Sequence, residues 1–285
     1  MTWGGRLATG TARRVTVELA GGPIAALRAG AAGDPAVLLV PGYTGSKEDF
    51  GPILDPIAQA GFQVSAIDLP GQYESPGPAD PAAYTPDALA AGLGEMAVRL
   101  GGRVHLVGHS FGGLVARAAV IADPPAFVDL VLMSSGPAAL DGARRQRIEQ
   151  LAPVLATGGL AAVYGAMQAA DAVAPGYAEP QAALAQFLER RFLTGSPVML
   201  QGMADALRAE PDRVAELVRT GVSCLVIHGA DDDSWPPAVQ AEMAQRLGAQ
   251  HVVIDAAAHS PAIENASATA EALLRFWRSA APTGP

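Results

Sequence analysis

Short runs of apolar residues recur along the chain, and most of them end in residues that favour turns. These runs predict eight strands, at residues 15–19, 24–28, 36–40, 64–68, 104–108, 128–134, 223–228 and 251–254. Longer stretches between them carry apolar residues at helical spacing and predict helices at residues 47–60, 86–100, 111–122, 237–247 and 262–280. Strands that alternate with helices indicate a mostly parallel sheet covered by helices on both faces.

The alternation stops between residues 137 and 211, where only helical patterns occur. These patterns predict three further helices, at residues 143–155, 180–194 and 197–208. We interpret the stretch as a helical cap inserted over one edge of the sheet. The predicted organisation is therefore a core formed by residues 1–137 and 212–285, interrupted by a cap of residues 138–211. Residues 1–14 are predicted to be a poorly structured leader.

The composition is that of a globular chain with a large core. Half of the 285 residues are apolar, 16% are charged, and the net charge is −9. An acidic surface disfavours nucleic acid and anionic membranes as partners. The sequence shows no secretory signal and no apolar stretch of about 18 residues. We therefore expect a soluble cytoplasmic protein without a membrane partner, whose oligomeric state does not follow from the sequence.

The sequence contains no recognisable motif for a metal or a cofactor. Cys224 is the single cysteine, and it lies in the apolar run 222–227, where a buried strand residue is expected. One cysteine forms no internal disulfide and no cysteine-rich metal site. A glycine loop of the kind that binds phosphate is also missing. We therefore expect an activity that needs neither metal nor cofactor.

The most informative motif is G-x-S-x-G, formed by Gly108, Ser110 and Gly112. A predicted strand precedes it and an alanine-rich predicted helix follows it, which is the context of a nucleophile elbow. Such a sharp turn strains the backbone of the serine and projects its Oγ away from the sheet. Side chains two residues before and after the serine would collide, which explains the glycines. Ser110 also begins the helix, where free N–H groups favour negative charge.

An ordinary glycine-rich turn is the alternative interpretation, because a chain with 32 glycines can contain this motif by chance. A serine nucleophile also needs a histidine that accepts its proton and a carboxylate that orients the histidine. His259 is the candidate base, since it follows the last predicted strand in a polar turn, where α/β sheets place ligand groups. His109 is expected to point away from the serine hydroxyl. The remaining histidines are interpreted as structural, and they are His105, His228 and His251.

The candidate acid lies in the turn after the strand 223–228. Three adjacent carboxylates occur there, on Asp231, Asp232 and Asp233. All three cannot face one histidine, and the others would be solvated charges or turn caps. Spacing alone does not choose between them.

Four blocks of the sequence together resemble the α/β-hydrolase superfamily, and within it the small cap-bearing esterases and related hydrolases of bacteria. The blocks are residues 41–46, 108–113, 229–236 and 258–261. Members commonly carry G-x-x-D after the strand that precedes the acid, with a proline four residues later. Placed on Gly229 and Pro236, this pattern implies that Asp232 is the acid. The stretch 68–71 is similar to the family's D-x-x-G loop, which is structural.

The resemblance also implies an oxyanion hole formed by the backbone N–H groups of Tyr43 and Phe111. In the family the first donor follows a His-Gly pair, whereas this chain has Pro41-Gly42. The departure affects local hydrogen bonding, but the residue after the glycine still offers an N–H group. Tyr43 also suits an alternative role as an aromatic side chain packed at a turn.

The resemblance therefore implies a serine hydrolase that cleaves a carboxylic ester or lactone of a small acyl substrate through an acyl-enzyme. Other cofactor-free reactions stay open, namely C–C bond hydrolysis, perhydrolysis, and acyl transfer or cyclisation in secondary metabolism. A non-catalytic binding protein is disfavoured because no member of the triad is missing. Apolar residues of the cap predict a nonpolar or mixed pocket, although helix packing is the better explanation for most of them. Tyr73 and Trp235 lie on loops expected beside that pocket.

Overall fold

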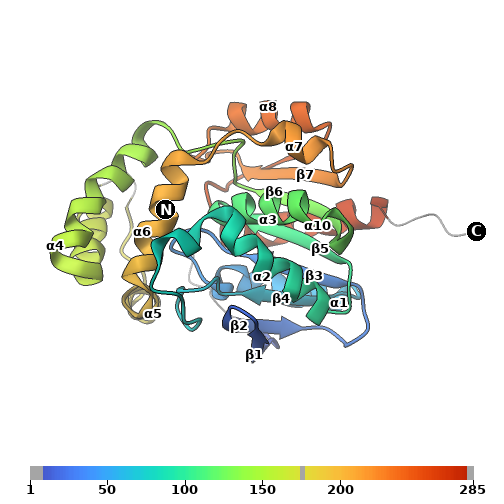
Figure 1. Ribbon diagram of the computed structural model, residues 1–285, viewed down its shortest axis with the longest axis horizontal. Helices are drawn as coiled ribbons and strands as arrows, with labels where there is room; N and C mark the ends of the chain where they lie inside the picture. Colours follow the sequence, from blue (N-terminus) through green and yellow to red (C-terminus); the bar gives the residue numbers. More distant parts are fainter. Residues whose placement is uncertain (1–8, 174–176, 281–285) are drawn as a thin grey trace, which may run out of the picture.

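The computed structural model describes residues 9–173 and 177–280, and its centre is one eight-stranded sheet (Figure 1). The strand order is β1-β2-β4-β3-β5-β6-β7-β8. The pairs β1–β2 and β2–β4 are antiparallel, and the remaining pairs are parallel. The strands are β1 (Arg13–Leu19), β2 (Gly22–Ala29), β3 (Ala36–Val40), β4 (Gln63–Ile67), β5 (Val104–His109), β6 (Phe127–Met133), β7 (Ser223–Gly229) and β8 (Gln250–Ile254). The predicted mostly parallel sheet of eight strands is confirmed.

Helices cover both faces of the sheet, as the alternation predicted. The main covering helices are α1 (Gly51–Gln59), α2 (Pro86–Arg99), α3 (Phe111–Ala122), α8 (Pro237–Leu247) and α10 (Ala266–Ala280). One buried apolar cluster joins α2, α3 and α8 to the sheet, and a second joins α1 and α10 to its other face. Every residue of β3 and β5 is buried, because a central parallel strand is covered on both sides.

Two predicted helices are each divided in the structure. The predicted helix at residues 47–60 consists of a 3-10 turn, Lys47–Phe50, followed by α1. The C-terminal one consists of α9 (Pro261–Glu264) and α10, which are separated at Asn265 by a non-helical backbone with φ −142° and ψ 70°. Short helices also occur at Pro81–Tyr84, Pro124–Ala126 and Val214–Val218 (α7).

The predicted leader is shorter than expected, because β1 begins at Arg13 and pairs along its whole length with β2. The leader's first eight residues lie outside the described residues. Arg13 and Arg14 are exposed at the start of an edge strand, and their charge concealed the strand pattern at the sequence level. The edge strand carries alternating exposed and half-buried residues, as a sheet edge that faces solvent on one side requires.

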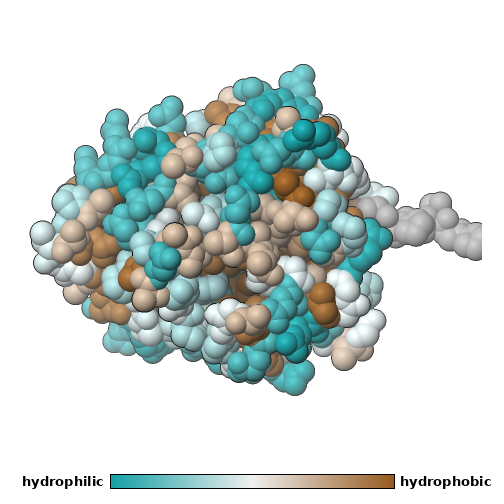
Figure 2. Space-filling model, viewed as in Figure 1, coloured by the Kyte–Doolittle hydropathy of each residue, from teal (hydrophilic) through white to brown (hydrophobic). Residues whose placement is uncertain are grey.

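The helical insertion between β6 and β7 consists of α4 (Gly142–Ala172), α5 (Ala182–Thr194) and α6 (Pro197–Ala209). We call these three helices the cap. They stand together at one end of the molecule, opposite the end at which α10 finishes (Figure 1). Figure 2 shows brown and tan residues interspersed with teal ones at this end, so the cap surface seen in that view is mixed in character.

Within the described residues, α4 is long and apolar enough, by length and composition, to cross a membrane. This finding corrects the expectation that no apolar stretch reaches about 18 residues, and α4 also extends beyond the predicted end at residue 155. Gly159 interrupts α4 with φ 66° and ψ −165°, so neither segment reaches the roughly 20 residues of a membrane span. Arg147 and Asp171 form an ion pair at 2.8 Å, whereas a straight helix would separate them by about 36 Å. The two segments of α4 therefore fold back on each other.

A buried arginine on α3 joins both ends of the cap to the core. The guanidinium of Arg117 is 1% exposed and donates to Pro137 O at 2.5 Å, where the chain leaves β6. The same group donates to Glu210 Oε1 at 2.7 Å, directly after α6. Burial lowers the pKa of Arg117 and the charge of Glu210 opposes that effect. Arg117 thus holds the start and the end of the insertion at one point.

We predict that Arg117→Met lowers the free energy of unfolding by about 3 kcal/mol, because it leaves Glu210 as a buried, unpaired charge. Adding Glu210→Gln should recover part of the loss. Arg275→Met is the control, since Arg275 and Glu271 form a pair with side chains 68% and 67% exposed, and its effect should stay within about 0.5 kcal/mol. Urea unfolding measures the free energy of unfolding of all three variants. Equal losses for Arg117→Met and Arg275→Met would contradict the role of Arg117 in holding the ends of the insertion.

Candidate active site

The turn between β5 and α3 has the geometry expected of a nucleophile elbow. Ser110 has φ 54° and ψ −120°, a strained conformation for a residue with a side chain. A Cβ on Gly108 would lie 2.3 Å from Gly112 O, and a Cβ on Gly112 would lie 2.4 Å from Pro41 O. Neither position therefore accepts a side chain, and the predicted reason for both glycines agrees with the structure.

The structure brings Ser110, His259 and Asp232 together at the carboxyl ends of β5, β8 and β7. The His259 Nε2 atom lies 3.0 Å from Ser110 Oγ, and its Nδ1 atom lies 2.9 Å from Asp232 Oδ1. In the tautomer that donates Nδ1–H to Asp232, Nε2 is free to accept the proton of the serine hydroxyl. Ser110 is 7% exposed, so the nucleophile is largely buried.

The surroundings of the three adjacent carboxylates distinguish them. Asp232 is 4% exposed and faces His259, whereas Asp231 and Asp233 are both exposed. Asp233 instead pairs with Arg144 of α4 at 2.6 Å. The structure thus places only Asp232 against the histidine, in agreement with the position implied by the resemblance.

Burial and three neighbouring groups act in opposite directions on the pKa of Asp232. Burial alone would raise the pKa of this carboxyl. The hydrogen bond and charge of His259, the Ser234 N–H and the amide of Gln240 together outweigh burial, so the pKa lies below its ordinary value. The carboxylate is therefore ionised and able to stabilise an imidazolium on His259.

Sequence reasoning missed Gln240, a residue of α8 that is 0% exposed. Its Nε2 donates to Asp232 Oδ2 at 2.9 Å and to Trp235 O at 2.8 Å. The amide thereby fixes the carboxylate oxygen that does not face His259. The only sequence signal was a polar residue on the inner face of a helix, which does not by itself identify a partner.

His109 also has a role at the site that its sequence position did not reveal. Its side chain was expected to point away from the serine hydroxyl, and its Nε2–H donates instead to the backbone oxygen of His259 at 2.7 Å. The two imidazole rings lie 5.0 Å apart. Burial, with a smaller contribution from the charge of His259, lowers the pKa of His109 to about 4. A neutral His109 therefore ties the elbow to the loop that carries the base.

The predicted oxyanion turn lies directly against the serine. A Cβ on Gly42 would lie 3.1 Å from Ser110 Cβ and 3.5 Å from its Oγ. Among the described residues the backbone N–H groups of Tyr43 and Phe111 donate to no acceptor. Gln72 Nε2 donates to Gly42 O at 2.7 Å and so supports the turn from the loop after β4. Two free N–H groups beside a serine are what an oxyanion hole requires.

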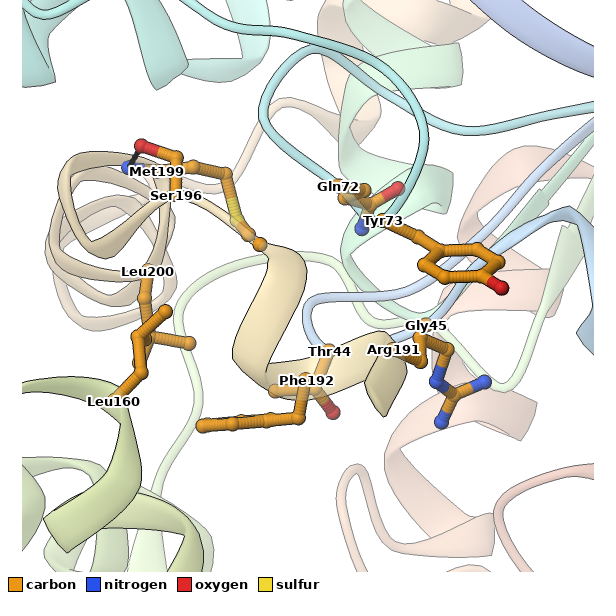
Figure 3. Close-up of a pocket in the computed structure, with 11 residues that line it drawn as sticks. Thr44, Gly45, Gln72, Tyr73, Leu160, Arg191, Phe192, Ser196, Met199 and Leu200 are labelled. Carbon is orange, nitrogen blue, oxygen red and sulfur yellow. Dashed lines mark hydrogen bonds between the residues drawn. The ribbon is translucent and has the colours of Figure 1, made fainter. Parts of the chain in front are cut away.

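A small, partly open pocket of about 20 Å³ lies between the cap and the oxyanion turn (Figure 3). Tyr73 and Arg191 lie on one side of the view, and Leu160 and Met199 on the other. The full lining comprises Thr44, Gly45, Gln72, Tyr73, Leu160, Arg191, Phe192, Gly195, Ser196, Met199 and Leu200. The pocket is therefore of mixed character, and Tyr73 is one of the residues that line it.

Trp235 does not line this pocket, which corrects the expectation drawn from its loop position. The indole is 3% exposed, and its Nε1–H donates to Ala138 O at 3.1 Å at the root of the cap. Its ring fills the space over Gly136, where a Cβ would approach the indole to 2.0 Å. Across residues 9–173 and 177–280, no three His, Cys, Asp or Glu side chains form a group able to hold a metal ion.

Comparison with known proteins agrees with the fold. Residues 37–272 match the model of the alpha/beta hydrolase family. A pimeloyl-[acyl-carrier protein] methyl ester esterase from Neisseria meningitidis is 27% identical over 254 residues, which cover 82% of this chain and 89% of that protein. A hydrolase from Pseudomonas aeruginosa has a TM-score of 0.78 at 25% identity and covers 94% of this chain and 99% of its own. A thermophilic esterase from Thermogutta terrifontis has a TM-score of 0.75 at 23% identity, with coverages of 94% and 99%.

The depressed pKa of His109 predicts a pH-dependent stability. The unfolded chain takes up a proton near the ordinary pKa of 6.5, whereas folded His109 stays neutral down to about 4, so this residue lowers stability as pH falls between those values. Between pH 7 and pH 5 the wild type should lose about 2 kcal/mol more than His109→Gln, which keeps an amide donor but does not titrate. Urea unfolding at both pH values measures the difference, and an equal loss would refute the assignment.

Proposed function

Since the chain belongs to the alpha/beta hydrolase family, we propose that it is a serine hydrolase that cleaves a carboxylic ester or lactone through an acyl-enzyme. The supporting observation is the continuous chain of hydrogen bonds from Ser110 through His259 to Asp232. In this proposal the three residues are the nucleophile, the base and the acid. Two backbone N–H groups, of Tyr43 and Phe111, form the oxyanion hole.

The first half of the reaction forms the acyl-enzyme. Ser110 Oγ attacks the carbonyl carbon of the ester while its proton passes to Nε2 of His259. The carbonyl oxygen becomes an oxyanion that accepts hydrogen bonds from the N–H groups of Tyr43 and Phe111. The carbon–oxygen bond to the leaving group then breaks, and the imidazolium returns its proton to the departing alcohol. Asp232 stays ionised throughout and stabilises the imidazolium.

The second half releases the acid. His259 accepts a proton from water, whose oxygen attacks the acyl carbon, and the same hole holds the second oxyanion. The carbon–oxygen bond to Ser110 breaks, and the serine regains its proton from His259. A lactone follows the same steps, except that the leaving alcohol stays attached to the acyl chain.

The pocket and the relatives support an ester as the bond that is cleaved. The small pocket beside the oxyanion turn is lined by apolar cap residues and by polar residues of the loops, a mixture that suits a substrate with apolar and polar parts. The Neisseria meningitidis relative is an esterase for a methyl ester, and the Thermogutta terrifontis neighbour is also an esterase. We therefore propose that this chain also acts on an ester.

A fluorophosphonate probe tests the nucleophile directly. We expect the probe to label the wild type at Ser110 and to leave Ser110→Ala unlabelled, because the phosphorus is attacked by an activated serine. The unlabelled wild type should hydrolyse p-nitrophenyl esters and lose that activity on labelling, and Ser110→Ala should lose about 10³-fold or more in kcat. Peptide mass spectrometry identifies the labelled residue. Labelling at another residue, or none, would overturn the proposal.

Substitution of the adjacent aspartates tests the acid. Asp232→Asn should lower kcat by roughly 10³- to 10⁴-fold, because the amide favours the wrong histidine tautomer. Asp231→Asn and Asp233→Asn, which alter exposed side chains, should stay within about threefold of the wild type. Steady-state rates with one p-nitrophenyl ester measure all three, and comparable losses would exclude Asp232 as the acid.

A further inference from the structure

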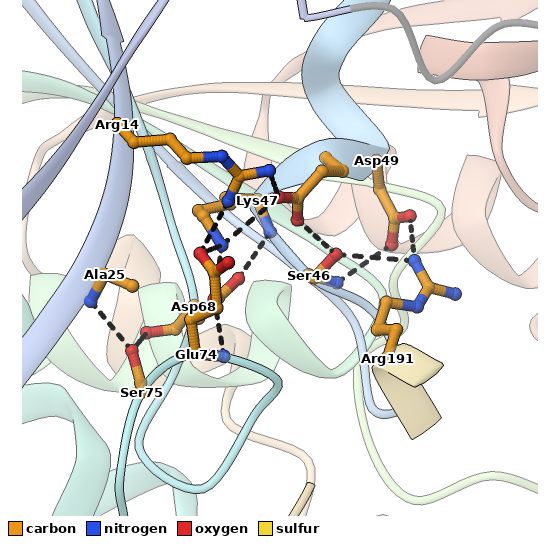
Figure 4. Close-up of polar contacts among 10 residues, drawn as sticks. Arg14, Ala25, Ser46, Lys47, Asp49, Asp68, Glu74, Ser75 and Arg191 are labelled. Atoms are coloured by element: carbon orange, nitrogen blue, oxygen red, sulfur yellow. Dashed lines mark hydrogen bonds and ion pairs between the residues drawn. The ribbon is translucent and has the colours of Figure 1, made fainter. Parts of the chain in front are cut away.

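A cluster of charged side chains surrounds the residues directly after the oxyanion turn (Figure 4). Its members are Arg14, Lys47, Glu48, Asp49, Asp68, Glu74 and Arg191. Lys47 is 0% exposed and pairs with Asp68 and Glu74, both at 2.7 Å. These contacts join the turn after β3 to the loop after β4. Arg191 is the member that comes from the cap, since it lies on α5.

Asp49 connects the cap to the oxyanion turn through its two carboxylate oxygens. Its Oδ1 accepts Nη1–H of Arg191 at 2.5 Å, and its Oδ2 accepts the backbone N–H of Ser46 at 3.2 Å. Figure 4 shows dashed lines from the Asp49 carboxylate to both of these partners. Asp49 is 7% exposed and Arg191 is 9% exposed, so the pair is largely shielded from water. Removing one partner of such a shielded pair leaves the other charge uncompensated and destabilises the local structure.

The turn itself is short, and several contacts restrain it. The N–H of Gly45 donates to Gly42 O at 3.1 Å, which closes the turn around Tyr43. The phenol of Tyr43 donates to Leu200 O of α6 at 3.0 Å. Asp49 therefore restrains the end of the turn through the backbone N–H of Ser46. Helix α6 restrains Tyr43, whose N–H is the first oxyanion donor, through the phenol of the same residue. Both restraints reach the cap.

We infer that Arg191 is a positioning residue for the oxyanion hole. Through Asp49 it fixes the turn that presents the Tyr43 N–H, so the hole is complete only when α5 is seated on the core. The cap then does more than line a pocket, because its placement determines how well the transition state is stabilised. This inference rests on the proposed function, since an oxyanion forms only if Ser110 attacks a carbonyl.

The test compares Arg191→Met with Arg190→Met, its neighbour on the same helix. The guanidinium of Arg190 lies over the Phe187 ring and, within the described part of the chain, forms no ion pair. With p-nitrophenyl acetate, Arg191→Met should lower kcat by about 10- to 100-fold while KM stays within about threefold. Affinity for a trifluoromethyl ketone, whose adduct with serine carries an oxyanion, should fall by a similar factor. Arg190→Met should leave all three quantities near the wild-type values.

Two further variants separate positioning from general damage to the fold. Arg191→Lys retains a cation for Asp49 and should recover part of kcat. Asp49→Asn keeps an acceptor for the Ser46 N–H but loses the ion pair, so it should lower kcat in the same way as Arg191→Met. This second variant also serves if Arg191→Met does not fold, as urea unfolding would show.

The outcomes distinguish the inference from the proposed function. A wild type that no fluorophosphonate labels at Ser110 would overturn both. A labelled wild type combined with unchanged kcat and inhibitor affinity in Arg191→Met and Asp49→Asn would overturn the inference alone. A rise in KM without a loss of kcat would also overturn it, because Arg191 would then act only as a wall of the pocket.

Discussion

The strained backbone of Ser110 is the constraint on which the rest of the site depends. A residue held at positive φ in a strand-to-helix turn costs about 1–3 kcal/mol, and it persists only where its surroundings leave no alternative. Here β5 is buried on both faces, Ser110 N–H donates to Met133 O at 2.9 Å, and the Ser110 carbonyl accepts the hydroxyl of Ser135 at 2.8 Å. The last residue of β6 and Ser135, two residues after the strand, thus hold the backbone on both sides of the serine.

The other site residues lie where a parallel sheet necessarily brings its loops together. The turns after β3, β5, β7 and β8 all leave the same edge, because these strands run in one direction. Each loop is then fixed by a different partner. Gln72 holds the oxyanion turn, Gln240 holds the acid, and His109 holds the loop of the base. The result is a set of groups whose positions depend on contacts between segments far apart in sequence.

Those long-range contacts explain what the sequence predicted and what it did not. The strands followed from local apolar runs, and Ser110 and His259 followed from their place at strand ends. Residue spacing left three aspartates equivalent, and only a family pattern selected Asp232. The sequence did not reveal the roles of Gln240, His109 or the Asp49–Arg191 pair, because each acts through a partner that no local pattern identifies. These partners lie 8, 150 and 142 residues away along the chain. Trp235 was misjudged because a loop position does not reveal whether an aromatic ring faces a pocket or the core.

The cluster around Lys47 has a consequence for the chemistry of the whole chain. Lys47 is the sole lysine among 285 residues, and its ammonium group is completely covered. Burial would lower its pKa, but Asp68 and Glu48 outweigh that effect and raise it, so the amine stays protonated and a poor nucleophile. Lysine-directed reagents and lysine-specific proteases therefore have a single target in this chain, and the folded state hides it. Modification or cleavage at Lys47 thus measures how often the core beside the oxyanion turn opens.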